Sequence, residues 1–137
     1  MKKTDRIFIA GASGLLGSAV KRRLEVMGYS SLLTPSHSDL DLTDASVVEN
    51  FFKSMKPQFV VLAAGKVGGI IENSKYPAEF MVSNMGIQLN VIQSAARHGV
   101  ERLMMYGSSC MYPREHDGPM GENLLMSDYP EPTSIAY

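Results

Sequence analysis

Cysteine is nearly absent from the sequence, and charge of neither sign is in excess. Cys110 is the only cysteine among 137 residues, so no disulfide can form within the chain, and the protein fits a reducing compartment. The 13 lysine and arginine residues nearly balance the 14 acidic residues, which leaves a net charge of -1. A surface that binds polyanions is therefore not indicated, and we expect no nucleic acid partner.

Long apolar runs are also missing. No run approaches the roughly 20 residues that a membrane-spanning helix needs, and the first residues, MKKTDRIFIAGASG, lack the apolar core of a signal peptide. Hydrophobic residues nevertheless make up 45% of the chain, so disorder is not indicated. A chain of this length suits one domain with a real core. We expect a cytoplasmic protein without a membrane partner.

Four short apolar runs predict the strands of a sheet. They are residues 6–11, 31–34, 59–64 and 103–106. The run FVVLAA at 59–64 is the strongest, because it is continuous and ends at Gly65, as a strand buried on both faces does. We therefore place it at the centre of the sheet, whereas 31–34 is a weak strand.

Three sets of apolar residues recur at helical spacing between these runs. They are Leu16, Ala19, Val20, Leu24 and Met27; Val47, Val48, Phe51, Phe52 and Met55; and Met81, Met85, Leu89, Ile92 and Ala96. Gly28 and Gly99 should end the first and third helices, and Thr43 or Asp44 can cap the second. The glycine-bearing stretch 66–76 and the proline-rich stretch after Cys110 predict loops.

This alternation predicts the fold class. Strands that alternate with helices at intervals of about 25 to 35 residues require a parallel sheet that is covered on both faces, with right-handed crossovers. The sequence therefore predicts an α/β protein with a doubly wound parallel sheet of the Rossmann type. We assign residues 1–137 to one dinucleotide-binding domain.

The segment GASGLLG places Gly11, Gly14 and Gly17 three residues apart, directly after a strand and at the start of a helix. The first glycine permits a tight turn, the second lets the backbone approach a pyrophosphate, and the third lets the helix pack close to the sheet. The helix N-terminus adds N–H donors and a favourable dipole. An ordinary glycine-rich turn is the alternative, but the flanking strand and helix favour a dinucleotide site.

The residues after the second strand bear on the choice of dinucleotide. An NAD-selective site carries an acidic residue there that binds the ribose hydroxyls. Here Ser36 and His37 occupy the position, and the first acid is Asp39. NADP is therefore permitted, although a histidine is a weaker phosphate anchor than an arginine. His37 as a solvated loop residue, and NAD as the cofactor, remain open alternatives.

The segment GSSCMYP follows the last predicted strand, where open α/β sheets bind ligands. A serine hydroxyl such as that of Ser108 can hydrogen-bond a substrate carbonyl. The thiolate of Cys110 can remove a proton from the carbon beside that carbonyl. On residue type alone, a serine turn with a small buried cysteine is the favoured interpretation.

Several segments together resemble one enzyme family. GASGLLG, VLAAGKVGGI, YPAEF and YGSSCMYP, followed by a tyrosine after a proline-rich loop, resemble the GDP-L-fucose synthases of the extended short-chain dehydrogenase/reductases. The resemblance runs along essentially the whole chain, and KVGGI with SSC is more specific than the glycine loop.

The resemblance implies a two-stage reaction in one pocket. Carbons 3 and 5 of GDP-4-keto-6-deoxy-mannose are epimerised, and the ketone is then reduced by hydride from NADPH. On this chain Ser108 would hold the keto oxygen, Tyr137 would be its proton donor, and Cys110 would be the base for epimerisation. We expect NADP(H), with NAD(H) left open, and no metal. The expected cofactor contacts are Gly11, Ala12, Ser13, Gly14, Leu15, Leu16, Gly17, His37, Asp41, Leu42, Ala63, Ala64, Gly65, Tyr106 and Gly107.

The chain departs from the family pattern in two ways. Ser13 and His37 stand where the family has NADP-binding arginines, and the sequence stops at Tyr137, before the lysine that follows the family's tyrosine by four residues. We therefore expect a sheet without its last strands, no substrate domain, and no activity from these 137 residues alone. The resemblance also implies a homodimer through a helix at 80–98. Another nucleotide-sugar epimerase or dehydratase, or a dinucleotide-binding fragment without activity, remains an alternative.

Overall fold

Four parallel strands form the sheet of the protein, in a computed structural model that describes residues 1–135. In chain order the strands are β1 (Ile7–Ala10), β2 (Leu32–Leu33), β3 (Phe59–Leu62) and β4 (Arg102–Met105). They lie in the order β2-β1-β3-β4, with Ile7 opposite Phe59 and Val60 opposite Leu103. The predicted strand FVVLAA is therefore an inner strand, as expected.

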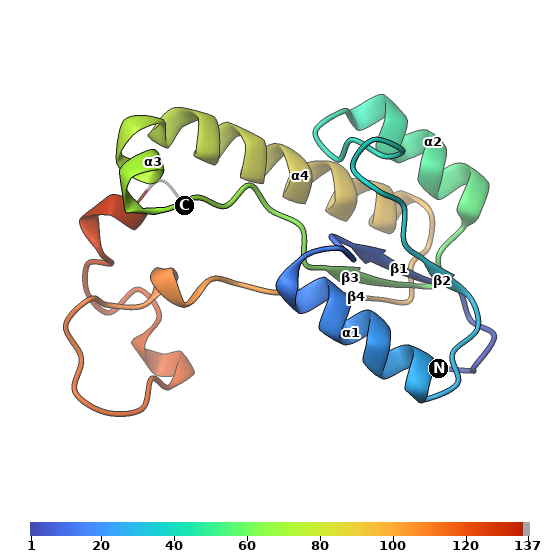
Figure 1. The fold of residues 1–137 in the computed structure, drawn as a ribbon, viewed down its shortest axis with the longest axis horizontal. Coiled ribbons are helices and arrows are strands. Elements are labelled where there is room, and N and C mark those ends of the chain that lie inside the picture. The colour runs from blue at the N-terminus through green and yellow to red at the C-terminus, as the bar shows by residue number, and fades with distance from the viewer. Residues whose placement is uncertain (136–137) are drawn as a thin grey trace. The chain divides into compact units, whose positions relative to one another are not determined.

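Helices cover both faces of this sheet (Figure 1). Helix α1 (Leu15–Val26) lies on one face, and α2 (Ala45–Met55) lies on the other together with the part of α4 (Pro77–Arg97) from Met85 onward. The predicted doubly wound α/β fold is confirmed. Among residues 1–135, no helix is long and apolar enough to cross a membrane.

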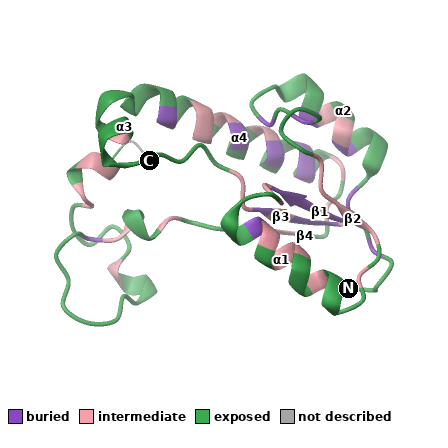
Figure 2. Ribbon diagram, in the orientation of Figure 1, coloured by how far each residue is buried: buried purple, intermediate pink, exposed green. Residues whose placement is uncertain are grey.

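Strands β1 and β3 are mostly buried (Figure 2), and the alternation of side chains along them divides the core into two clusters. Phe8, Ala10, Val60 and Leu62 point toward α2 and α4, where they pack with Phe52 and Val91, among others. On the other face lie Ile7, Ile9 and Phe59, against Val20 and Leu24 of α1. All of these strand residues are buried, which is why the strands appear in the sequence as continuous apolar runs.

The chain divides into two compact units. The first comprises Met1–Gly65 and Met85–Tyr106, and so contains the whole sheet. The second comprises Lys66–Asn84 and the segment from Gly107 onward. Its elements are α3 (Ile70–Lys75), the first turns of α4, and the short 3₁₀ turns η1 (Ser109–Met111), η2 (Glu122–Leu124) and η3 (Pro132–Ser134), of which η3 packs against α3.

The predicted loop at 66–76 is partly wrong, because α3 lies within it. This helix has six residues, with Gly69 as its N-cap and Glu72 in its first turn, where the helix dipole favours an acid. Six residues give too few turns for an apolar period to show in the sequence. The proline-rich stretch has only the three short turns, close to the predicted loop.

The apolar faces of α1 and α2 are narrower than predicted. Of the residues predicted for the first helix, Leu16 and Ala19 in α1 and Met27 just after it are exposed, and Gly17 is the buried residue of α1. In α2, Val48 and Phe52 are buried, whereas Val47 and Met55 are exposed. Each helix touches the sheet along one line, so residues at the edge of the apolar stripe stay in contact with water.

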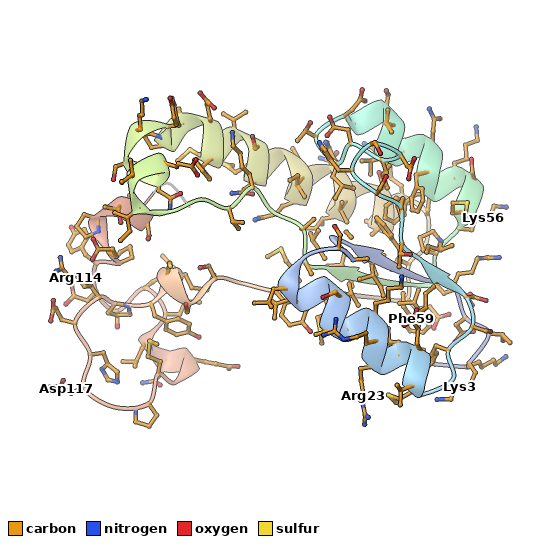
Figure 3. The ribbon with its side chains drawn as sticks, in the orientation of Figure 1. Lys3, Arg23, Lys56, Phe59, Arg114 and Asp117 are labelled. Atoms are coloured by element: carbon orange, nitrogen blue, oxygen red, sulfur yellow. The ribbon has the colours of Figure 1, made fainter. Side chains whose placement is uncertain are left out.

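The helix ends follow the predicted capping residues. The Asp44 carboxylate, rather than Thr43, caps α2 by accepting hydrogen bonds from the backbone N–H groups of Ser46 and Val47. Gly28 and Gly99 have positive φ angles of 81° and 69° just after α1 and α4, a conformation that favours glycine at a helix end. Lys56, labelled in Figure 3 at the end of α2, also has a positive φ.

The stripe predicted to bury α4 lies on its exposed side. Met81, Met85, Leu89, Ile92 and Ala96 are all exposed, and the buried residues are Phe80, Ile87, Val91, Ser94 and Ala95. Both stripes have helical spacing, because α4 carries apolar residues on two sides. Periodicity identifies a stripe but does not say which of two stripes faces the sheet.

Candidate cofactor and active site

The glycine loop has the tight turn and the close helix–strand contact that the spacing of its glycines predicts. Gly11 has a φ of 84°, and a Cβ placed on it would lie 2.8 Å from the carbonyl oxygen of Ala63 and from the Cα of Ala64. A Cβ on Gly17 would lie 2.0 Å from the carbonyl oxygen of Gly11. Side chains at both positions are therefore excluded, and α1 starts in close contact with the end of β1.

The N-terminus of α1 is open to an anionic ligand. Gly14 is its N-cap and provides no side-chain cap, and no acidic residue lies in the first turn. The first N–H groups of a helix have no partner within the helix, so they can donate to a pyrophosphate. Ser13, Leu15 and Leu16 are exposed beside them. The loop residues thus fit a dinucleotide: a close-packed backbone, unused donors, and apolar side chains that a ligand can cover.

The first carboxylate in the loop after β2, that of Asp39, is hydrogen-bonded within the loop. Asp39 accepts hydrogen bonds from the hydroxyl of Ser36 at 2.6 Å and from the Ser36 backbone N–H at 3.2 Å. The Ser36 hydroxyl bond, followed by the backbone bond, lowers the pKa of Asp39. Asp39 is therefore an ionised carboxylate turned back on its own loop, while His37 is exposed. This arrangement leaves the basic side chain at 37 accessible.

Asp41 and Leu42 lie in the same connection but have different surroundings. Asp41 is exposed, and its Oδ1 accepts hydrogen bonds from Thr43 Oγ1 at 2.7 Å and from Thr43 N at 2.9 Å. These bonds lower the pKa of Asp41, with a smaller contribution from the charge of His37. Leu42 is buried in the core. Helix α4 also holds this loop, because Asn90 Nδ2 donates to the carbonyl oxygens of Leu42 and Thr43.

The other expected cofactor residues of the first unit lie at strand ends. Ala63 and Ala64 are half-buried, and the Ala63 N–H donates to the carbonyl oxygen of Ala10. Tyr106 follows β4, and its N–H donates to the carbonyl oxygen of Leu62. The carboxyl ends of β1, β3 and β4 are thus joined by hydrogen bonds. The structure brings the glycine loop, Ala63, Ala64 and Tyr106 to one edge of the sheet.

In the second unit Ser108 and Cys110 form one turn. The Ser108 hydroxyl oxygen accepts a hydrogen bond from the Cys110 backbone N–H at 3.1 Å, which caps η1. A hydroxyl has one donor and two acceptor sites, so this bond leaves the hydroxyl proton for another partner. Ser108 is half-buried and Cys110 is exposed. The serine turn of the alternative interpretation is therefore present, but its buried cysteine is wrong, because Cys110 is exposed.

Arg114 ties the rest of this segment together. Arg114 is labelled in Figure 3. Its guanidinium Nε lies 3.2 Å from a carboxylate oxygen of Glu131 and 3.3 Å from one of Glu115, and its backbone N–H donates to the carbonyl oxygen of Tyr129. These contacts join the two ends of the proline-rich stretch. Tyr137, the expected proton donor, lies outside the described residues.

Sequence reasoning missed two asparagines on α4 that hold loops. Asn84 accepts a hydrogen bond from the Lys66 N–H at 2.7 Å and donates to the Lys66 carbonyl oxygen at 3.0 Å. Asn90 makes the bonds to Leu42 and Thr43 described above. Asparagine is unfavourable inside a helix because its side chain competes for backbone groups. Two asparagines in one helical pattern were the signal that could have found them.

Comparison with known proteins identifies the family of this chain. Its sequence matches the NAD dependent epimerase/dehydratase family over residues 7–137. The chain belongs to this family. Its glycine loop and strand order agree with that assignment, because a nicotinamide dinucleotide binds at the carboxyl edge of such a sheet.

Three individual proteins within the comparisons are similar to the chain over almost all of its length. A protein named putative GDP-L-fucose synthase 2 from Arabidopsis thaliana is 48% identical over 137 residues, which are 100% of this chain and 42% of that protein. The solved structure of DdhaC has a TM-score of 0.96 at 41% identity, covering 100% of this chain and 40% of that one. A GDP-D-glycero-L-gluco-heptose synthase from Campylobacter jejuni, solved in the presence of NADPH, has a TM-score of 0.93 at 32% identity, covering 99% and 40%.

The resemblance found in the sequence is thus confirmed, and it extends along the whole chain. The chain spans about two-fifths of the length of the relatives that it matches. The activity and substrates of a whole enzyme are therefore a matter of proposal for this chain.

Proposed function

We propose that the chain is the cofactor-binding part of an NADP-dependent epimerase/reductase that converts GDP-4-keto-6-deoxy-mannose to GDP-L-fucose. The observation that carries this proposal is the turn at Ser108 and Cys110, which presents an exposed thiol two residues from a hydroxyl whose proton is not used in the turn. A dinucleotide-binding module without chemistry has no need of this pair.

The two side chains suit proton transfer beside a ketone. The Cys110 thiolate removes the proton from carbon 3 or carbon 5, and the electron pair of that C–H bond moves toward the 4-keto oxygen. The Ser108 hydroxyl donates a hydrogen bond to this oxygen and stabilises the negative charge that develops there. A second acid then donates a proton to that carbon from the opposite face, which inverts the centre, and the Cys110 thiol loses its proton to solvent. In the proposed enzyme Tyr137 shares the keto oxygen with Ser108.

The cofactor supplies hydride for the reduction of the same ketone. Gly11, Gly14 and Gly17 would hold the pyrophosphate at the start of α1, Asp41 and Leu42 would lie near the adenine, and Ala63 to Gly65 would lie along the rest. Two observations support NADP over NAD: the Asp39 carboxylate is bound to Ser36, and His37 is exposed. A cationic or hydrogen-bonding side chain there favours a 2′-phosphate.

Further parts of the proposal concern assembly and location. The exposed apolar stripe of α4, from Met81 to Ile92, supports a homodimer, because apolar faces of this kind are commonly covered by another chain. The names of the relatives support a GDP-sugar as the substrate. The sugar named differs from one relative to another: it is fucose in one and a heptose in another. We place the enzyme in the cytoplasm, in keeping with its free cysteine.

The test uses Cys110→Ser in the protein at its natural length and measures the epimerisation stage separately from the reduction stage. With substrate in D₂O and no NADPH, wild-type protein should introduce deuterium at carbons 3 and 5, and Cys110→Ser should slow this by about 10²- to 10⁴-fold, the usual contribution of a general base. Ser109→Ala, at the exposed neighbour of Cys110, is the matched control and should exchange normally.

Two results would contradict the proposal. Deuterium entry at the wild-type rate in Cys110→Ser would remove the assigned base. Wild-type protein that binds NADPH but neither exchanges these carbons nor oxidises NADPH with this substrate would favour another member of the family.

A further inference from the structure

Asn90 lies inside α4 and reaches across to a loop 47 residues earlier in the chain. It is half-buried, and its Nδ2 donates to the carbonyl oxygen of Leu42 at 3.0 Å and to that of Thr43 at 3.1 Å. One amide group thus donates to two successive backbone carbonyls. A residue with poor helix propensity is kept within a 21-residue helix, and its side chain serves the loop rather than the helix.

Four features hold this loop, and among the described residues Asn90 provides its long-range hydrogen bonds. The Asp41 carboxylate bonds to Thr43, two residues away, and Asp44 caps the next helix. The Leu42 side chain is buried in the core. Local bonds to Asp41 hold the N–H sides of the Leu42–Thr43 and Thr43–Asp44 peptide groups. The Asn90 amide holds their carbonyl sides and joins them to α4.

We propose that Asn90 is a positioning residue for cofactor binding: its amide holds the backbone at Asp41 to Thr43 in the conformation that receives the adenosine half of the dinucleotide. This inference rests on the proposed function, which puts Asp41 and Leu42 near the adenine. Groups that contact a ligand must be held by neighbours to within a fraction of an ångström. Loss of the Asn90 bonds frees two carbonyls, which turn to bind water and carry the loop with them.

A purely structural role for Asn90 is the competing explanation, and a residue one turn away serves as its control. Ser94 is buried on the same helix, and its hydroxyl donates to Glu49 of α2 at 3.1 Å. Ser94→Ala therefore removes a side-chain bond between α4 and the α2 region of similar kind, but it does not touch the loop at 41–43. If general loosening of α4 impaired binding, Ser94→Ala would impair it as well.

The experiment measures binding of adenosine 2′,5′-bisphosphate, which carries only the adenosine half of NADP, by calorimetry on the protein at its natural length. We expect Asn90→Ala to raise the dissociation constant about tenfold, the effect of a lost hydrogen-bonded contact, and Ser94→Ala to change it by less than about twofold. Asn90→Asp has the same size but replaces the donor with an acceptor, so it should weaken binding at least as much. It provides the measurement if the alanine variant does not fold.

The outcomes distinguish this inference from the proposed function. Equal affinity in wild type, Asn90→Ala and Asn90→Asp overturns the positioning role and leaves the proposed function standing. An equal loss in Asn90→Ala and Ser94→Ala also overturns it, because the effect is then general. Wild-type protein that binds neither the bisphosphate nor NADPH contradicts the proposed function, and the role of Asn90 falls with it.

Discussion

Gly17 is the position where a single added methyl group conflicts most with the fold. A Cβ there would lie 2.0 Å from the Gly11 carbonyl oxygen and 2.6 Å from its carbonyl carbon, and both are backbone atoms at the base of the turn. They can give way only if α1 moves off the end of β1. Because the same turn presents the helix N-terminus to the dinucleotide, packing and binding are coupled at this residue.

Gly17→Ala should therefore lower the free energy of unfolding by about 1 to 3 kcal/mol, the usual cost of overpacking, and should also weaken NADPH binding. Gly86→Ala is the control, since a Cβ at Gly86 in α4 meets nothing within 4 Å. It should be neutral or stabilise the protein by up to about 1 kcal/mol, because alanine favours helix more than glycine does. Denaturant unfolding with and without NADPH measures both; equal stabilities for the two variants would contradict the prediction.

At the residue scale, the sequence could predict whatever depends on local spacing. The strand, turn and helix around Gly11 to Gly17 follow from one short segment, and local sequence also limits the cap of α2 to Thr43 or Asp44, of which the structure has Asp44. The bonds of Asn90 to Leu42 and of Glu49 to His98 join residues nearly 50 positions apart. No local pattern specifies such pairs, so they became visible only with the tertiary structure.

At the scale of elements, a polar cluster joins α2 to the end of α4. Glu49 Oε1 lies 2.7 Å from His98 Nε2, Glu49 Oε2 accepts a hydrogen bond from the Ser94 hydroxyl, and Arg97 Nη1 lies 3.6 Å from the same oxygen. His98 also stacks on Phe52. The hydrogen bond from His98 is the main cause that lowers the pKa of Glu49 below its ordinary value of 4.5.

This cluster should make stability depend on pH in the acid range. The folded protein holds Glu49 ionised to lower pH than the unfolded chain does, so the stabilisation is present above about pH 4.5 and is lost as the pH falls further. Glu49→Gln should be less stable than wild type at neutral pH, and the difference should shrink as the pH falls toward 3. Urea unfolding across this range measures it, with exposed Glu101→Gln as the control. A difference that stays constant with pH would contradict the assignment.

The elements were predictable in proportion to their length and burial. The inner strands β1 and β3 are buried on both faces and so are continuous apolar runs in the sequence. The six residues of α3 are too few for a period. For α4 the sequence predicts the helix but not the face that it buries, because apolar residues occupy two sides and only contact with the sheet selects Ile87, Val91 and Ala95.

At the scale of the molecule, the apolar surface that remains exposed is unevenly distributed. In α4, Met81, Val82, Met85, Leu89 and Ile92 are between 44% and 71% exposed. Strand β4 pairs with β3 alone among the described strands, and Met104 and Met105 on it are exposed. Unpaired strand edges and contiguous apolar faces favour association with other protein surfaces.

The 137-residue polypeptide by itself should therefore be only marginally stable and should associate as its concentration rises. We expect analytical ultracentrifugation to show species larger than 15.0 kDa, together with a weak thermal transition. Met85→Lys combined with Leu89→Lys should reduce the association, because both side chains are exposed on α4 and a charge there opposes burial by a partner. The same pair should leave the core intact, since neither residue packs in it. A monomer that melts cooperatively well above room temperature would show instead that the sheet and its two helical layers are sufficient without a covering surface.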